Sequence, residues 1–279
     1  MRRARWTHFS IPPTPSHAGL IAEGARLGLS IFVEKPVDET ADGTRRLFSV
    51  ASGAGVALCC GYQRRFDPSY VALREGLKGG SVGRPVTASV FFGDHPAPPR
   101  EFLLGGGAHI IPDCAAHDVD FLRWALDDDV ASVYAASTSS DDELRRGDVA
   151  DAATMVLKFR RGAVATVTLS RSACYGYDQR VEVFGTGGLA SVGNLHEDAS
   201  VVADGSGVRR PRLVRSFPER FEVAFFNEMD AFAGTLLGET AWPVSEDDCV
   251  AVQRVCDAAV ESCITGKDVC LEELVTEIH

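Results

Sequence analysis

The first 80 residues alternate between a helical and a strand-like spacing of hydrophobic positions. Apolar residues recur at helical spacing from His17 to Leu27, and Gly28 follows where a helix C-terminus is expected. Residues 30–33 then form a short run that is apolar from Ile31 to Val33, as in a strand buried on both faces. The unit recurs once, with a helix predicted over 39–52 and a strand over 56–60. This order indicates a parallel sheet covered by helices.

After a third predicted helix at residues 67–78, strands follow one another with few helices. Residues 85–92 alternate between apolar and polar, and an apolar helix is predicted over 113–126. Further β-rich runs occupy residues 130–137, 150–159, 163–170, 180–184 and 189–192. We expect an antiparallel sheet with helices on one side. Residues 202–215 are polar and predict a surface excursion, and two final helices are predicted over 218–237 and 245–264.

The bulk composition is that of an ordinary globular protein. The chain has 279 residues, of which 45% are hydrophobic and 24% charged, and this length favours two domains. Its net charge of -11, with no cluster of Lys or Arg, argues against a nucleic-acid partner. No apolar run approaches the roughly 18 residues of a membrane helix, and no signal core follows the N-terminus. We therefore expect a cytoplasmic protein that does not enter a membrane.

The eight cysteines lack the spacing of a zinc site or of a CxxC redox pair. Four of them, Cys249, Cys256, Cys263 and Cys270, recur at intervals of seven residues. On a helix such neighbours lie roughly 10 Å apart, which is too far for a disulfide. We predict small buried side chains with free thiols.

Lys35 is the first candidate for chemistry. It follows a buried strand directly and precedes Pro36, and ligands of open α/β sheets gather beyond the carboxyl ends of the strands. A lysine there is suited to donate a hydrogen bond to a substrate. The alternative is a solvated lysine paired with Glu34, and position alone leaves both open.

Asp113 and His117 form the second candidate, four residues apart at the start of the predicted apolar helix. This spacing puts both side chains on one helix face, where a carboxylate can orient an imidazole that accepts a proton. The alternative is an ordinary N-terminal acid and a core histidine. One histidine and one aspartate are too few for a metal site, although His109, Asp118 and Asp120 lie near in sequence, so we expect no metal.

The sequence contains no G-x-G-x-x-G between a strand and a helix. Gly53 and Gly55 precede a predicted strand, and Gly185 to Gly188 occupy a predicted hairpin turn. Because such glycines let backbone N–H groups approach a pyrophosphate, the main clamp for a dinucleotide is missing from this chain.

The order of the motifs resembles the Gfo/Idh/MocA family of NAD(P)-dependent oxidoreductases, and within it the inositol 2-dehydrogenases. The motifs are Pro13-x-x-x-His17, Glu34-Lys35-Pro36, Gly61-Tyr62-Gln63-Arg64-Arg65-Phe66-Asp67, Asp94-His95-Pro96, Asp113-x-x-x-His117 and Tyr175-Gly176-Tyr177. The resemblance covers roughly residues 10 to 270. Taken in order the motifs are specific, although each is weak alone.

The resemblance implies an α/β fold of two domains. Residues 1–83 would be a partial dinucleotide-binding domain with a Rossmann-type parallel sheet whose first strands, with the glycine fingerprint, would precede Met1. Residues 84–279 would be an α+β domain for substrate binding and oligomerisation, with a large, open, mostly antiparallel sheet. Because family members generally associate through the exposed face of this sheet, a homo-oligomer, either a dimer or a tetramer, is expected.

The resemblance also implies a hydride transfer between an inositol-like polyol or sugar and NAD or NADP. Lys35, Asp113 and His117 would be the catalytic residues, with His117 as the proton acceptor. The residues implied for the cofactor are Pro13, His17, Glu34, Lys35 and Gln63. The residues implied for the substrate are Arg64, Asp94, Tyr175 and Tyr177.

Two alternatives stay open beside the dehydrogenase. Without the glycine-rich turn, the chain could be a non-catalytic member that keeps a sugar pocket and an oligomerisation surface. It could also be a sugar-processing enzyme of the same superfamily that performs no net oxidation. Cofactor titration distinguishes the dehydrogenase from the non-catalytic member.

Overall fold

A computed structural model describes residues 14–105 and 109–271, and these residues form two compact units. Unit 1 comprises the described residues up to Val71 together with Val223–Arg254. Unit 2 comprises Ala72–Glu222 and the described residues from Val255 onward. The boundary predicted between residues 83 and 84 does not anticipate that residues 223–254 return to the first unit.

Unit 1 contains two helix-strand repeats, as the hydrophobic pattern predicts. They are α1 (His17–Arg26), β1 (Ile31–Glu34), α2 (Ala41–Gly53) and β2 (Leu58–Gly61), preceded by the short helix η1 (Thr14–Ser16). The strands pair in parallel, from Ile31 opposite Leu58 to Glu34 opposite Gly61. Gly28, just after α1, has φ 68°, the left-handed conformation that ends a helix most easily at glycine. The two strands form a partial Rossmann-type sheet, and both end at the same edge.

The later segment of unit 1 supplies aromatic side chains that pack against β1. Its helices are most of α8 (Glu222–Leu237) and the start of α9 (Glu246–Thr265), whereas the short helix η2 (Gln63–Phe66) follows β2 in the first segment. The Phe32 ring lies 5.8 Å from Phe232 and 6.0 Å from Trp242, centroid to centroid, in edge-on contacts. Trp242 also lies 5.1 Å from Phe66 and donates its ring N–H to the carbonyl of Cys60 at 3.1 Å. This aromatic cluster joins residues about 200 positions apart in the sequence.

Unit 2 is built on a seven-stranded sheet in the order β11-β4-β5-β6-β3-β7-β8. The strands are β3 (Pro85–Gly93), β4 (Val130–Thr138), β5 (Ala152–Phe159), β6 (Val164–Ser170), β7 (Asp178–Gly185), β8 (Gly188–Val192) and β11 (Val269–Cys270). All neighbours pair antiparallel except β3 and β6, which are parallel. The predicted mostly antiparallel sheet is confirmed, and the parallel pair makes β3 and β6 end at one edge.

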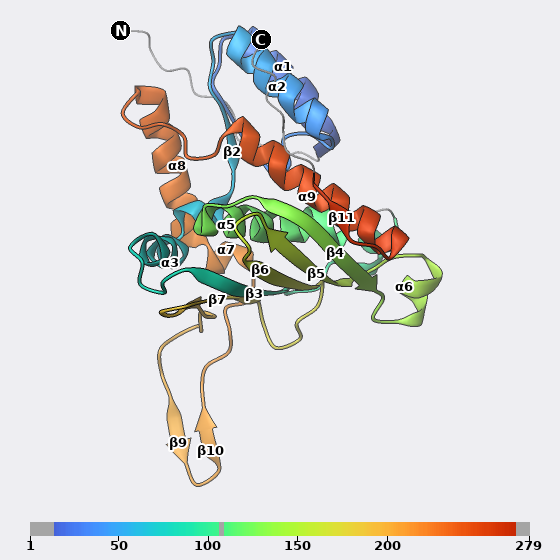
Figure 1. Cartoon of the computed structure of the whole chain (residues 1–279), viewed down its shortest axis with the longest axis vertical. Helices are drawn as coiled ribbons and strands as arrows, with labels where there is room; N and C mark the ends of the chain where they lie inside the picture. The colour runs from blue at the N-terminus through green and yellow to red at the C-terminus, as the bar shows by residue number, and fades with distance from the viewer. Residues whose placement is uncertain (1–13, 106–108, 272–279) are drawn as a thin grey trace. The chain divides into compact units, whose positions relative to one another are not determined.

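Side chains alternate between the two faces of this sheet. On β7, Val181 and Val183 are buried, whereas Glu182 and Phe184 are exposed. Helix α5 (Ala116–Leu126) lies along the buried face (Figure 1). The opposite face stays open in the described chain, so the prediction of helices on one side is confirmed for this unit.

Several elements differ from their predictions. The excursion at residues 202–215 contains a hairpin of β9 (Val202–Asp204) and β10 (Gly207–Arg209), which projects from the sheet in Figure 1. The helix predicted over 218–237 is divided into α7 (Phe217–Arg220) and α8. Helices not anticipated are α4 (Arg100–Leu104) and α6 (Asp142–Arg146). Helix α3 (Pro68–Lys78) agrees with its prediction within one residue.

The cysteine prediction is confirmed only in part. All eight thiols are free, and Cys249 and Cys256 are buried in α9. Cys263 is half-buried and Cys270 is exposed on the edge strand β11, so burial of these two was a wrong prediction. For Cys270 the helical spacing does not apply, because α9 ends at Thr265. Within residues 14–105 and 109–271, no helix is both long and apolar enough to cross a membrane.

Candidate functional site

In unit 1, the residues predicted for cofactor binding gather at the edge where β1 and β2 end. Glu34 is the last residue of β1 and Lys35 follows it, whereas Gln63 lies two residues beyond the end of β2. His17, at the start of α1, is 3% exposed and places its Nδ1 2.9 Å from the carbonyl oxygen of Pro36. This contact fixes the turn that carries Lys35 against α1. The remaining cofactor prediction, Pro13, lies outside the described residues.

Arg64 occupies the short helix η2 at the same edge and is only 2% exposed. Its guanidinium carbon lies 5.6 Å from the ring centroid of Tyr70, a cation–π distance. The neighbouring Arg65 pairs with Asp248 at 3.2 Å and donates to the carbonyl oxygen of Pro243 at 2.6 Å. Both arginines are therefore held in place, Arg64 against an aromatic ring and Arg65 by an acid.

A pair of acids, the half-buried Glu34 and the fully buried Glu228, lies at this edge, and the pairing was not predicted from the sequence. Glu228 is 0% exposed on α8, and burial together with the nearby Glu34 raises its pKa to about 9. Burial also raises the pKa of Glu34, although Lys35 and His17 oppose that shift. The signal available in the sequence was a glutamate within the largely apolar run from Val223 to Leu237.

In unit 2, the predicted residues Asp94 and Asp113 meet at Arg171. Arg171 donates to the Asp113 carboxylate at 2.7 Å, and its side chain is 5% exposed. Burial raises the pKa of Asp94, and the positive charge of Arg171 opposes this shift. The arrangement follows from topology, because Asp94 comes directly after β3 and Arg171 directly after the parallel strand β6. Sequence reasoning missed Arg171, although it stands at the end of a clearly predicted strand.

The helix that carries Asp113 and His117 begins earlier than predicted. Residues Ile111–Ala115 form a π turn, η3, and α5 starts at Ala116, so Asp113 lies in the π turn and His117 in the first turn of α5. His117 is half-buried. Since a π turn changes the helical phase, the shared helix face inferred from α-helical spacing does not follow directly. Pairing of Asp113 with His117 stays a prediction.

The tyrosines at 175 and 177 have different environments. Tyr175 is 55% exposed and donates its hydroxyl to Asp178 at 2.7 Å. Tyr177 is 4% exposed, and its ring packs edge-on against Phe92 and Phe221. Of the two, only Tyr175 therefore presents much of its side chain to solvent.

Asp178 holds this turn to β7. Its buried carboxylate accepts from Arg180 Nε at 2.7 Å, from Asn194 Nδ2 at 2.6 Å and from the Tyr175 hydroxyl. Burial raises the pKa of Asp178, but these hydrogen bonds outweigh burial and bring the pKa below its ordinary value. The Asp178 carboxylate therefore holds the Tyr175 side chain in place through a hydrogen bond.

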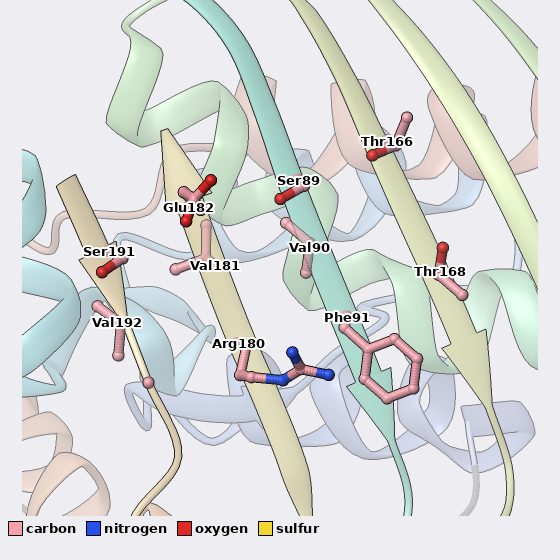
Figure 2. A pocket seen from close by; sticks show the side chains of 11 residues that line it. Ser89, Val90, Phe91, Thr166, Thr168, Arg180, Val181, Glu182, Ser191 and Val192 are labelled. Carbon is pink, nitrogen blue, oxygen red and sulfur yellow. The ribbon is translucent and has the colours of Figure 1, made fainter. Parts of the chain in front are cut away.

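The open face of the large sheet carries a depression of about 410 Å³ (Figure 2). Its lining comes from β3, β6, β7, β8 and the residue that follows β8: Ser89, Val90, Phe91, Thr166, Thr168, Arg180, Val181, Glu182, Ser191, Val192 and Gly193. The Arg180 guanidinium lies 4.9 Å from the Phe91 ring centroid. None of the predicted site residues lines this depression. Across the described ranges, no group of three or more His, Cys, Asp or Glu side chains could hold a metal ion.

Comparison with known proteins identifies the family of this two-unit α/β protein. A model of the GFO/IDH/MocA C-terminal domain matches residues 70–191. An inositol 2-dehydrogenase of Rhizobium meliloti is 34% identical over 251 residues, which is 90% of this chain and 76% of the relative. A scyllo-inositol 2-dehydrogenase (NAD(+)) of Bacillus subtilis is 32% identical over 94% of this chain and 76% of its own.

Solved structures agree with this family. The crystal structure of myo-inositol 2-dehydrogenase from Lactobacillus plantarum superposes with a TM-score of 0.87 at 25% identity, covering 94% of this chain and 79% of that one. The chain belongs to the Gfo/Idh/MocA family of oxidoreductases.

Proposed function

We propose that this chain transfers a hydride between a ring carbon of an inositol-like polyol and a nicotinamide cofactor. The names of the relatives support the substrate class and, for one of them, NAD. The observation that carries the proposal is the ion pair of the buried Arg171 with Asp113, which precedes His117 by four residues in the sequence. A charged pair with one buried member, close in sequence to a histidine, is typical of a site for proton transfer.

In unit 2, His117 accepts the proton of the reacting hydroxyl. An imidazole, with an ordinary pKa of about 6.5, is suited to this task near neutral pH. Arg171 holds the Asp113 carboxylate in place, so that Asp113 either orients His117 or accepts a hydrogen bond from the polyol. Asp94 and the exposed Tyr175 offer further hydrogen bonds to hydroxyl groups. Tyr177 supports that turn from within the core.

In unit 1, Lys35 stabilises the developing alkoxide through its positive charge. Arg64 offers donors to further hydroxyls. The edge formed by β1 and β2 presents a carboxylate, an ammonium and an amide from Glu34, Lys35 and Gln63, and this donor set suits the hydroxyls of a ribose and a carboxamide. Together with His17 and Pro13, these residues would hold the nicotinamide end of the cofactor. When bound, the cofactor supplies the hydride acceptor.

Calorimetric titration of NAD and of NADP into the 279-residue chain tests the proposal, followed by addition of myo-inositol while the absorbance of the reduced cofactor is monitored. We expect binding and reduction with at least one cofactor. Lys35→Ala and His117→Ala should each lower kcat by about a hundredfold or more. An exposed lysine on β5, Lys158→Ala, is the matched control. Binding of myo-inositol without any cofactor binding would favour the non-catalytic alternative.

We further propose that a second copy of the chain covers the open face of the large sheet. Exposed apolar side chains on that face include Tyr134, Val164, Phe184 and Leu189, between 37% and 52% exposed. Such a surface is typical of a contact between proteins. Light scattering coupled to size-exclusion chromatography should give a dimer or tetramer, and Phe184→Glu should yield a smaller species. A monomeric wild type would contradict this proposal.

A further inference from the structure

The acids Glu34 and Glu228 come from distant parts of the chain, and both lie close to Gly61. Glu34 Oε2 and Glu228 Oε1 lie 3.3 and 3.4 Å from the position that a Cβ atom on Gly61 would occupy. Glu34 ends β1, Gly61 is its partner on the neighbouring strand β2, and Glu228 reaches them from α8. The absence of a side chain at Gly61 therefore leaves the space in which two carboxyl groups approach each other.

The surroundings of Glu228 do not compensate a negative charge. The residue is 0% exposed, and neither carboxyl oxygen has a side-chain hydrogen-bond partner in the part of the chain that the structure describes. The Phe32 ring lies 2.8 Å from the same Cβ position on Gly61 and belongs to the aromatic cluster with Phe232 and Trp242. An ionised carboxylate in apolar surroundings is costly unless it is paired.

The positive groups at this edge act on one acid of the pair only. Lys35, in the turn after β1, and His17, at the start of α1, both favour the ionised form of Glu34. On Glu228, the groups that act are the negative charge of Glu34 and a backbone N–H at Tyr62, the residue after β2. Two like charges this close cannot both persist in a site of low polarity.

We propose that Glu228 is protonated in the folded protein at neutral pH, whereas the nearby carboxylate of Glu34 keeps its negative charge. The pair then holds one proton and one negative charge, and this charge lies next to Lys35 in the sequence. A neutral Glu228 therefore adds no second negative charge to the turn that carries Lys35.

This arrangement explains why a glutamate occupies an apolar helix position. A leucine or a glutamine at this position would carry no proton that responds to pH. Glutamate at 228 therefore makes the Glu34–Lys35 turn sensitive to alkaline pH, where a second charge would appear.

Infrared spectroscopy of the purified chain, without cofactor or substrate, tests the proposal independently of the proposed function. At pH 7 the spectrum of the wild type minus Glu228→Gln should contain the C=O stretching band of a protonated carboxylic acid. The exposed glutamate at the start of the same helix, Glu222→Gln, is the matched control and should give no such band. A difference spectrum without that band, or a band removed by Glu34→Gln but not by Glu228→Gln, overturns the proposal.

If Glu228→Gln does not fold, an infrared titration of the wild type alone still tests the proposal. The carboxylic acid band should persist above pH 7 and disappear as the pH approaches about 9, the pKa that burial and Glu34 give Glu228. Disappearance near pH 4 to 5, the ordinary range of a glutamate, would overturn the assignment.

The pH dependence of unfolding gives a third readout with a definite sign. Because the pKa of Glu228 is raised in the folded state, the folded protein binds one proton more than the unfolded chain between about pH 4.3 and the folded-state pKa. Rising pH in this window therefore favours unfolding. Relative to Glu228→Gln, the unfolding equilibrium constant of the wild type should increase about tenfold per pH unit. A ratio that does not change with pH overturns the proposal.

Discussion

Two buried carboxyl groups, one in each unit, respond to burial in opposite ways. Asp178 in unit 2 is 3% exposed and Glu228 in unit 1 is 0% exposed, so both have lost nearly all contact with solvent. The pKa of Asp178 is nevertheless below its ordinary value, whereas that of Glu228 rises to about 9. Burial raises both values, and the difference comes from the neighbours.

Asp178 receives hydrogen bonds from a guanidinium, an amide and a phenol, whereas Glu228 lies near a second acid. Donors stabilise the charged form and reverse the effect of burial, while a like charge adds to it. Exposure alone therefore does not determine whether a buried acid is charged. The number of donors and the sign of the nearest charge decide it.

Among the substitutions that test this comparison, removal of Arg171 should lower the free energy of unfolding most. Arg171→Met takes a buried cation from Asp113 and Asp94 and leaves two acids near each other, as at Glu34 and Glu228. We expect a loss of about 3 kcal/mol in the free energy of unfolding, because a buried ion pair is costly to break from one side. Chemical denaturation of wild type and variant measures this loss in the free energy of unfolding. Arg145→Met removes an exposed guanidinium and should cost below about 0.5 kcal/mol; equal losses would contradict the argument.

A smaller effect is expected from neutralising Asp178. Asp178→Asn keeps the shape but weakens the hydrogen bonds from Arg180, Asn194 and Tyr175, for a loss of about 2 kcal/mol near pH 7. Because the pKa of Asp178 is lowered by folding, this contribution is complete above the ordinary aspartate value of about 3.9 and is lost as pH falls through the lower folded-state value. Denaturation at several pH values should therefore show wild type and variant converging only in acid.

The exposed Asp204 in the β9–β10 hairpin provides the comparison for this variant. Its carboxylate also accepts from an arginine and a serine, but in contact with solvent. Asp204→Asn should change stability much less than Asp178→Asn. Similar losses would mean that burial does not strengthen the hydrogen bonds of Asp178.

The smallest effect concerns the space between the two acids of unit 1. In Gly61→Ala the new Cβ would lie 2.8 Å from the Phe32 ring and within 3.4 Å of both carboxyl oxygens. Since the ring and the acids can shift slightly, we expect a loss of about 1 kcal/mol, together with a change in the carboxylic acid infrared band. Gly53→Ala in α2 meets no atom within 4 Å and is the control. A neutral Gly61→Ala with an unchanged band would show that the acids do not meet there.

The fold was largely predictable because its signals are local. Helical spacing followed by Gly28 predicted α1 to within one residue. The alternating runs gave the main strands of the large sheet, but they could not show that β3 pairs in parallel with β6. Strand order depends on contacts between residues far apart in sequence, which periodicity does not contain.

The candidate site, too, was predictable from the sequence only in part. The sequence by itself pointed to the family through the order of its motifs, and it singled out Lys35, Asp113 and His117 as candidate site residues. It determined too that a lysine follows one strand and an aspartate another. Only the tertiary structure revealed that Arg171 holds Asp113 and that Glu228 approaches Glu34. The charge of a buried group depends on neighbours brought from 58 positions away for Arg171 and from another helix for Glu228, and folding alone assembles those neighbours.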